Sequence, residues 1–439
     1  MTLPFQASAL LLRGLATLAL LSGLSMGGCG RAAAPNVAEG GPVSWVQMTG
    51  DGAELRATAT DGHCPTAQID GSPATMTIRA AQGTDFPAIC ALPAPPTAHS
   101  IGMIDHPVVL PGGTPRRIVV IGDTGCRVSG ITAQDCNHPK GWPFARVAAL
   151  AAAQRPDLVI HVGDYFYREG PCPLGKSNCA GSPYGDRFET WRTDLFDPAA
   201  PLLERAPVVF VRGNHEDCRR GGGGWARLLD AGPWRGACPQ TDEAFVVRLG
   251  TLSLGVLDSS LADDRDASAA DVARMVPQFE RLKAELGTGD SFLLTHRPIW
   301  AAAPVSHMGP FGTIFVGLNA TEQAAARGRI APGVSMVVSG HVHHFAAYSY
   351  GPSRPAQLVA GEGGANLSES ARLGPNRASL VIDGMTAAKT NFARYGYVLM
   401  TRGEAGWTID AHDLDDRIVA HCHLIRRDLA CDTDLKGRP

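Results

Sequence analysis

The sequence predicts an α/β domain preceded by a smaller β domain. From about residue 113 onward, apolar runs of strand length alternate with Ala-, Leu- and Arg-rich segments of helical periodicity, which is typical of α/β domains. Before that point, short alternating stretches are broken by Gly, Pro and Asp, a pattern that favours a small sheet. At roughly 100–200 residues per domain, a chain of 439 residues is long enough for both units and a sizeable core.

The N-terminal segment predicts export. A positive charge at Arg13 precedes the short apolar stretch 16–24, and small residues then lead to Cys29, which is the layout of a secretory signal over residues 1–28. Residues 26–29 (MGGC) also resemble a bacterial lipobox, although Met stands where Leu is usual, so Cys29 is a candidate lipid anchor. We therefore expect a protein of the periplasm or cell envelope that meets the membrane only through Cys29.

The composition excludes several classes of protein. The formal net charge of -3 and a sequence pI near 6.5 lack the basic character of a dedicated nucleic-acid-binding protein. No apolar run reaches the roughly 18 residues that a membrane-spanning helix needs, which excludes a multi-span transporter. The sequence gives no indication of an oligomeric state.

The cysteines predict disulfide bonds. With Cys29 set aside, ten of the eleven cysteines remain, and an even number in an oxidising compartment favours pairing. No CxxC pair occurs, so a zinc ribbon or finger is not expected. Pairing between sequence neighbours would join Cys64 to Cys90, Cys126 to Cys136, Cys172 to Cys179, Cys218 to Cys238 and Cys422 to Cys431.

Composition also suggests where the domains begin and end. Residues 29–44 are small and polar with Pro and Gly, as in a flexible tether. Residues 45–112 form the predicted small β domain, and its exit is rich in proline and closes with a Pro-Gly-Gly turn. The α/β domain then spans 113–415, and 416–439 form a tail held by a disulfide.

The α/β domain contains five apolar runs that predict buried strands. Helices are expected at 144–154 and 271–285, and closing strands within 395–413. The five runs are Arg117–Gly122, Leu158–Gly163, Val208–Gly213, Ser291–Thr295 and Val334–Gly340.

A polar cluster follows each of these five runs, in the sequences GDTG, GDYFY, GNHE, LLTH and GHVH. The residues that can carry chemistry are Asp123, Asp164, Tyr167, Asn214, His215, Glu216, His296, His341 and His343. Taken singly, such an Asp is often a turn residue and such a His a satisfied polar group. Because ligands gather at the carboxyl ends of strands in α/β sheets, all five clusters are expected in one crevice. Mixed oxygen and imidazole donors suit transition-metal dications and ferric iron, and two ions sharing Asp164 would use them well.

These five motifs resemble the ordered motifs of the calcineurin-like metallophosphoesterases. Gly125 and Tyr167 narrow the resemblance to the purple acid phosphatase branch, whose pattern reads GDxG, GDxxY, GNH(E/D), VxxH and GHxH. It spans about residues 116–415, and Leu293 stands where the family usually has Val. The resemblance implies a four-layer α/β/β/α sandwich of two mixed sheets, so that 113–415 would be a metallophosphoesterase catalytic domain.

The resemblance also implies a role for each motif residue. Fe(III) would be held by Asp123, Tyr167 and His343, and a dication (Fe, Zn or Mn) by Asn214, His296 and His341, with Asp164 bridging the two ions. His215 would donate a proton to the leaving group or stabilise the transition state, and Glu216 would orient His215. The expected reaction is hydrolysis of a small phosphate monoester by a metal-bound hydroxide.

Two other functions stay open at this stage. A phosphodiesterase would use the same dinuclear core with a different rim, and a surface-tethered binding protein would be an inactive relative. A P-loop is rejected, because Pro171 and Pro173 in GPCPLGKS lack the N–H groups that would cradle phosphate. Residues 221–224 are expected to form a mobile loop at the rim of the metal site, with a surface turn as the alternative, and His421 and His423 are expected as surface residues.

Overall fold

The computed structural model describes residues 41–59, 61–307, 313–368 and 376–432. The predicted signal peptide (1–28), Cys29 and most of the predicted tether lie outside the described residues. From Pro42 onward the chain forms one compact unit. No helix in the described ranges is long and apolar enough to cross a membrane.

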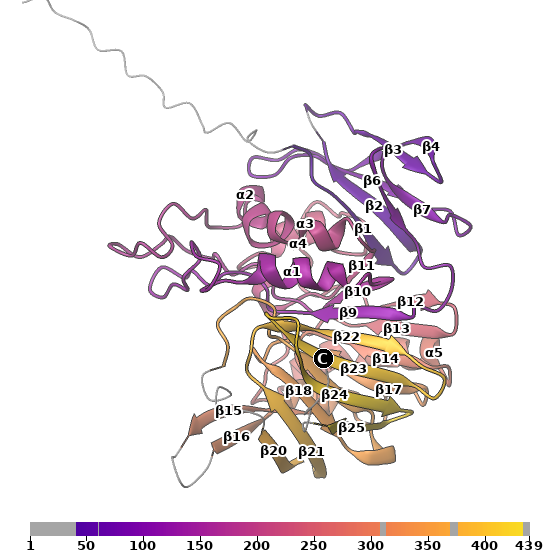
Figure 1. The fold of residues 1–439 in the computed structure, drawn as a ribbon, viewed down its shortest axis with the longest axis vertical. Coiled ribbons are helices and arrows are strands. Elements are labelled where there is room, and N and C mark those ends of the chain that lie inside the picture. The colour runs from indigo at the N-terminus through magenta and orange to yellow at the C-terminus, as the bar shows by residue number, and fades with distance from the viewer. Residues whose placement is uncertain (1–40, 60, 308–312, 369–375, 433–439) are drawn as a thin grey trace, which may run out of the picture. The chain divides into compact units, whose positions relative to one another are not determined.

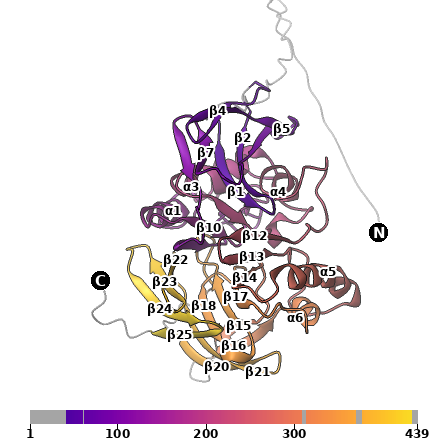
Figure 2. The ribbon, with the colours of Figure 1, turned by 90° about the vertical axis from the view of Figure 1, so that its right-hand side faces the viewer.

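Two large mixed sheets form the centre of this unit (Figures 1 and 2). The first has eleven strands in the order β25 (Asp428–Asp432), β24 (Ile418–Ile425), β23 (Trp407–Asp413), β22 (Gly396–Arg402), β9 (Arg117–Ile121), β10 (Leu158–His161), β11 (Val208–Phe210), β1 (Ser44–Thr49), β2 (Gly52–Thr58), β6 (Ile89–Pro93) and β5 (Thr77–Ala80). The second has eight, in the order β12 (Phe245–Leu249), β13 (Leu252–Val256), β14 (Ser291–Leu294), β17 (Val334–Ser339), β19 (Ala356–Ala360), β18 (Phe345–Ser349), β21 (Met385–Phe392) and β20 (Asn376–Ile382).

The five apolar runs become the strands that carry the predicted clusters. β9, β10 and β11 pair in parallel in the first sheet, and β14 and β17 pair in parallel in the second. Alternate residues of these strands meet between the sheets, where Ile118 and Ile160 share one apolar core with Phe292 and Met336. The strands are buried on both faces, which explains their nearly continuous apolar sequence.

Helices cover the outer face of each sheet, as the four-layer prediction requires. α1 packs on the first sheet beside α3, and α5 packs on the second beside α6. The fold-class prediction is therefore confirmed. The helices are α1 (Phe144–Ala153), α2 (Phe188–Trp191), the π-helix η1 (Arg192–Phe196), α3 (Asp197–Leu203), the 3-10 turn η2 (Asn214–Glu216), α4 (Gly222–Leu228), α5 (Ala269–Leu286), α6 (Ala320–Ala326) and the 3-10 turn η4 (Gly351–Ser353).

The N-terminal β region contributes to two sheets. β1 pairs in parallel with β11, so that β1, β2, β6 and β5 extend the first sheet. A separate small sheet consists of β4 (Ser72–Thr75), β3 (Thr66–Ile69), β7 (Ser100–Met103) and β8 (His106–Val109). Later in the chain, β15 (Ala301–His307) and β16 (Thr313–Leu318) form a two-stranded hairpin of their own. At the other end, β24 and β25 also belong to the first sheet. The domain boundaries at 112 and 415 stay predictions.

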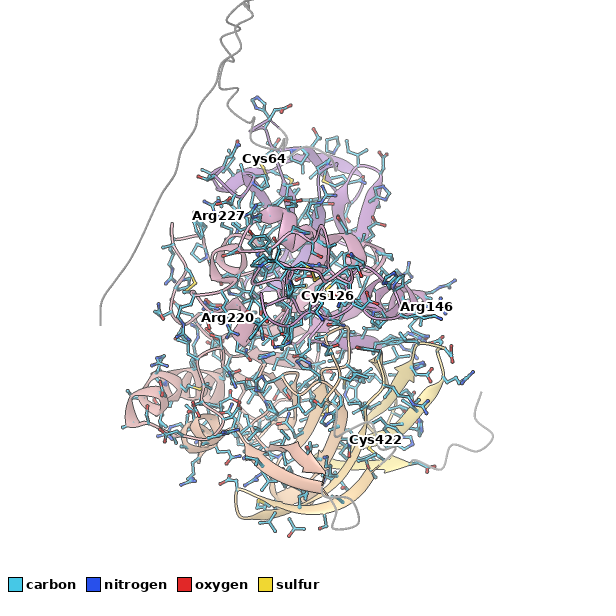
Figure 3. The ribbon with its side chains drawn as sticks, turned by 90° about the vertical axis from the view of Figure 1, so that its left-hand side faces the viewer. Cys64, Cys126, Arg146, Arg220, Arg227 and Cys422 are labelled. Atoms are coloured by element: carbon cyan, nitrogen blue, oxygen red, sulfur yellow. A yellow bond between two sulfur atoms is a disulfide. The ribbon has the colours of Figure 1, made fainter. Side chains whose placement is uncertain are left out.

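All five predicted disulfides are present, each between sequence neighbours. Figure 3 shows Cys64, Cys126 and Cys422, one member each of three of these pairs. Disulfides of this density are typical of proteins that mature in an oxidising compartment.

The glycine run at 221–224 differs from its predicted secondary structure. It begins helix α4 instead of forming a loop. The Asp186 carboxylate accepts hydrogen bonds from the backbone N–H groups of Gly223 and Gly224, which would otherwise lack partners in the first turn. A Cβ at Gly224 would collide with the indole of Trp191, so close packing requires glycine there.

Candidate metal centre

The five predicted clusters meet at the carboxyl ends of the central strands. Asp123 follows β9, Asp164 follows β10, and Asn214 lies in η2 just after β11. His296 and His341 follow β14 and β17 of the opposite sheet. The site therefore lies where the two sheets present their strand ends to one another.

The backbone at the site is held in an unusual conformation. Asp123, Asp164 and His341 have φ angles of 54°, 58° and 69°, in the left-handed region that most residues avoid. Such strain is concentrated at functional sites, where the surrounding structure fixes it. Gly213 is required by close approach, because a Cβ there would collide with the Asp164 carboxylate.

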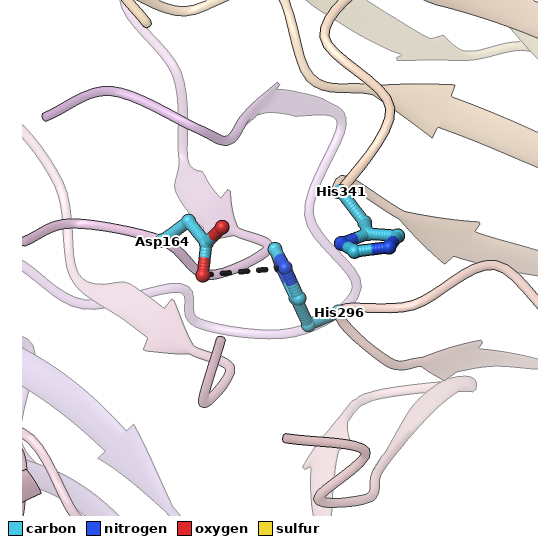
Figure 4. Close-up of side chains that lie close together, drawn as sticks. All are labelled: Asp164, His296 and His341. Atoms are coloured by element: carbon cyan, nitrogen blue, oxygen red, sulfur yellow. Dashed lines mark ion pairs between the residues drawn. The ribbon is translucent and has the colours of Figure 1, made fainter. Parts of the chain in front are cut away.

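Asp164 is the residue around which the others gather. Its carboxylate belongs to two groups whose potential ligand atoms all lie within 4.8 Å of one another. The first group contains Asp123 and His343, and the second contains His296 and His341 (Figure 4). Asp164 Oδ1 lies 3.3 Å from His296 Nε2, the contact drawn in Figure 4.

Tyr167 completes the first group. Its Oη lies 2.8 Å from Asp164 Oδ2, 3.2 Å from Asp123 Oδ1 and 2.9 Å from His343 Nε2. The ring is buried, with 1% of its surface exposed. Burial and the two neighbouring carboxylates raise the pKa of Tyr167 well above its ordinary value. The phenol therefore stays protonated unless a strong Lewis acid binds it.

Asn214 joins the second group. Its Oδ1 lies 3.2 Å from His296 Nε2, while His296 Nδ1 donates to the carbonyl oxygen of Val162 at 2.8 Å. This second bond fixes the ring and aims Nε2 at Asp164 and Asn214. All seven sequence-predicted ligand residues are thus brought together.

The charges around Asp164 favour a cation. Burial opposes ionisation of Asp164, but His296 and His215 outweigh it and hold its pKa well below its usual range. Burial would likewise lower the pKa of His296, yet Asp164 reverses the effect and raises it to about 9. A carboxylate held ionised in a buried site attracts positive charge, and here the protonated imidazole of His296 supplies that charge.

Two residues that the sequence did not single out support His341. Its Nε2 lies 3.0 Å from Asp264 Oδ2 and 3.0 Å from Arg297 Nη1, and Arg297 pairs with Asp264 at 2.5 Å. Burial and the Arg297 charge lower the pKa of His341 to about 4, so the ring is neutral. A neutral imidazole with one nitrogen tied to a carboxylate is the usual state of a metal-binding histidine.

Glu216 does not orient His215, contrary to expectation. Its carboxylate accepts hydrogen bonds from the backbone N–H groups of Gly213, Asp164, Tyr165 and Phe166 at 2.9–3.0 Å. The carboxylate therefore has no capacity left for the imidazole. Burial, with a contribution from Asp164, raises the pKa of Glu216 to about 8.

Glu169 takes the place predicted for Glu216. Its Oε1 lies 2.5 Å from His215 Nδ1, while His215 Nε2 is 3.9 Å from Asp164 Oδ2. The His215 and Tyr167 rings are 4.0 Å apart between centroids. Glu169 lies two residues beyond Tyr167 in the sequence, but nothing in the motif itself identifies it as the partner of His215.

The sequence profile of the calcineurin-like phosphoesterase family matches residues 116–345, more than half of the chain. The chain belongs to this family. It is therefore a hydrolase of a family that uses a dinuclear metal centre and acts on small phosphate esters. A comparison of the sequence of this calcineurin-like phosphoesterase with curated proteins found no match.

Solved structures show the same fold. A purple acid phosphatase, PPD1, from yellow lupin (Lupinus luteus) seeds has 14% sequence identity and a TM-score of 0.53, over 89% of this chain and 74% of that chain. PhoD has 13% identity and a TM-score of 0.51, over 90% of this chain and 92% of that chain. At these identities the likeness concerns the fold alone.

We predict that Glu216→Ala lowers the free energy of unfolding by about 3 kcal/mol or more, because four buried N–H groups lose their acceptor. Urea denaturation measures it. Glu169→Ala is the matched control, since its carboxylate is partly exposed and contacts side chains only. Equal losses of stability in the two variants would contradict the structural role of Glu216.

Proposed function

We propose that this phosphoesterase hydrolyses phosphate monoesters with two metal ions. The observation that carries the proposal is the position of Asp164, which belongs to two adjacent groups of potential ligands. A single shared carboxylate between two donor sets is the arrangement that a pair of ions needs.

The donor sets fit two different ions. Asp123, Tyr167 and His343 would hold Fe(III), because a buried phenol next to two carboxylates becomes a ligand only for a strong Lewis acid. Asn214, His296 and His341 offer an amide oxygen and two imidazoles, which suit Fe(II), Zn(II) or Mn(II). When bound, two such ions polarise the phosphoryl group and activate a water molecule.

His215 is the proposed proton donor to the leaving group. Glu169 holds Nδ1, so Nε2 faces the centre beside Asp164. With Nδ1 fixed, the ring can deliver a proton from Nε2 to the oxygen of the departing alcohol without reorienting. Glu169 acts through His215 and is a positioning residue.

An arginine at the site favours a monoester over a diester. The Arg127 guanidinium lies 4.8 Å from the centroid of the Tyr167 ring, whereas Arg220 and Arg297 are already paired with Asp217 and Asp264. A phosphate monoester carries about -1.5 to -2 charge at neutral pH, more than the single charge of a diester. The monoester, which carries the higher negative charge, is therefore attracted more strongly to the guanidinium than the diester is.

The proposed location is the periplasm or cell envelope. Five disulfides support an oxidising compartment. The predicted signal over 1–28 and the candidate lipid anchor at Cys29 give the route.

The function is tested by metal content and by turnover of p-nitrophenyl phosphate against bis(p-nitrophenyl) phosphate. We expect two ions per chain and faster turnover of the monoester. Arg127→Ala should lower kcat/KM for the monoester more than for the diester, and exposed Arg219→Ala should change neither. Faster diester turnover would establish a phosphodiesterase instead, and no turnover by the metal-loaded protein would leave a binding protein.

The colour of the protein tests the Tyr167 assignment. A phenolate on Fe(III) should give a visible charge-transfer band, which Tyr167→Phe should abolish while the ring packing keeps the fold. Visible absorption and circular dichroism measure the two effects. An active, colourless wild type that contains zinc or manganese but no iron would refute the purple acid phosphatase assignment, while the family membership would stand.

Leaving groups of different pKa test the proton donor. For alkyl phosphates, which need a proton on departure, His215→Ala should lower kcat by about 10²–10⁴-fold. Glu169→Gln should cause a smaller loss of the same kind, and both losses should shrink for p-nitrophenyl phosphate. Exposed Glu204→Gln serves as the control. Equal losses for both substrates would exclude proton donation by His215.

A further inference from the structure

A second pair of histidines lies in strand β24, apart from the residues of the candidate metal centre. Residues 421–423 read His-Cys-His, and alternate side chains of a strand point to opposite faces. Cys422 belongs to the core between the sheets and is bonded to Cys431 on β25. His421 and His423 therefore share the outer face.

The two imidazoles face one another through the nitrogens that bind metals. His421 Nε2 lies 3.0 Å from His423 Nε2, and the rings are nearly perpendicular, at 89°. Two nitrogens at the usual zinc distance of 2.0–2.1 Å in a tetrahedral site would be about 3.3 Å apart. A shift of a few tenths of an ångström would accommodate an ion.

A carboxylate orients the first of these rings. Asp410 on β23 is the register partner of His421, and its Oδ1 lies 2.5 Å from His421 Nδ1. This bond places the proton of neutral His421 on Nδ1 and leaves the Nε2 lone pair directed at His423. Carboxylate, imidazole and ion in this order recur in protein metal sites.

We propose that His421 and His423 bind a transition-metal dication outside the catalytic centre, with water completing the coordination. Imidazole donors suit Cu(II), Ni(II) and Zn(II), and the affinity should be highest for Cu(II). The frame is rigid, because β24 pairs with β23 on one side and β25 on the other. His423 is exposed and His421 is 8% exposed, so an ion reaches the pair from solvent.

Copper(II) titration of the protein with its catalytic centre filled tests the site. The wild type should take up one more Cu(II) than His423→Ala, with a nitrogen-ligand signal in the electron paramagnetic resonance spectrum. Asp410→Asn should weaken that binding about 10–100-fold, as the loss of an orienting carboxylate does. Phosphatase activity and the metal content of the catalytic centre should not change in His423→Ala.

His138→Ala is the matched control. His138 is 69% exposed and lies 2.7 Å from Asp135, so it has the orienting carboxylate. In the described part of the chain, the His138 ring is hydrogen-bonded to Asp135 and to no second imidazole. The control should bind as much Cu(II) as the wild type. Equal Cu(II) uptake by the wild type and His423→Ala would overturn the proposal and leave the pair as a hydrogen bond between imidazoles.

Discussion

The buried Glu216 carboxylate is the interaction on which the centre depends. It ties the loop after β10 to the loop after β11 through four backbone N–H groups. Asp164, Tyr167 and Asn214 stand on those two loops, and Asp164 has a left-handed φ of 58° that the surrounding bonds must fix. The donors are therefore held in place by the protein itself, and such preorganisation is what electrostatic catalysis requires.

The carboxylates that contact the candidate ligands and His215 have different roles. Glu216 binds backbone, Glu169 holds His215, and Asp264 holds His341. Asp123 and Asp164 remain to face the proposed ions, and the backbone N–H of His341 donates to Asp123 Oδ2 at 2.9 Å. The three supporting carboxylates fix the rings and loops, so the negative charge of the other two is concentrated where cations are needed.

The fold and the meeting of the seven candidate ligand residues at one edge were predictable from the sequence, because each of them follows a buried strand within a few residues. The supporting groups were not. Asp264 lies in a loop with no motif and reaches His341 only through the tertiary fold. The glycines of helix α4 suggest a loop, and the helix depends on the Asp186 carboxylate, which accepts from their backbone N–H groups. The pairing of β1 with β11 likewise joins segments about 160 residues apart in the sequence. The local sequence pattern determines the helices and strands, whereas the contacts of Asp264, Asp186 and β1 depend on which distant segments meet in the tertiary fold.

The disulfides explain how loops so close to the centre remain fixed. Cys126 lies three residues after Asp123, and Cys218 lies four after Asn214, and both are bonded to neighbours in the sequence. Arg212 joins the second bridge to the centre, since it donates to the carbonyl oxygen of Glu216 at 3.0 Å and lies 3.2 Å from Cys238 Sγ and from Asp258 Oδ2. A disulfide restricts the unfolded chain and is worth about 2–4 kcal/mol. Placed here, the two bridges stabilise the loops after β9 and β11. The loop after β10, which carries Asp164, is tied to the loop after β11 through Glu216, so all three loops belong to one connected unit.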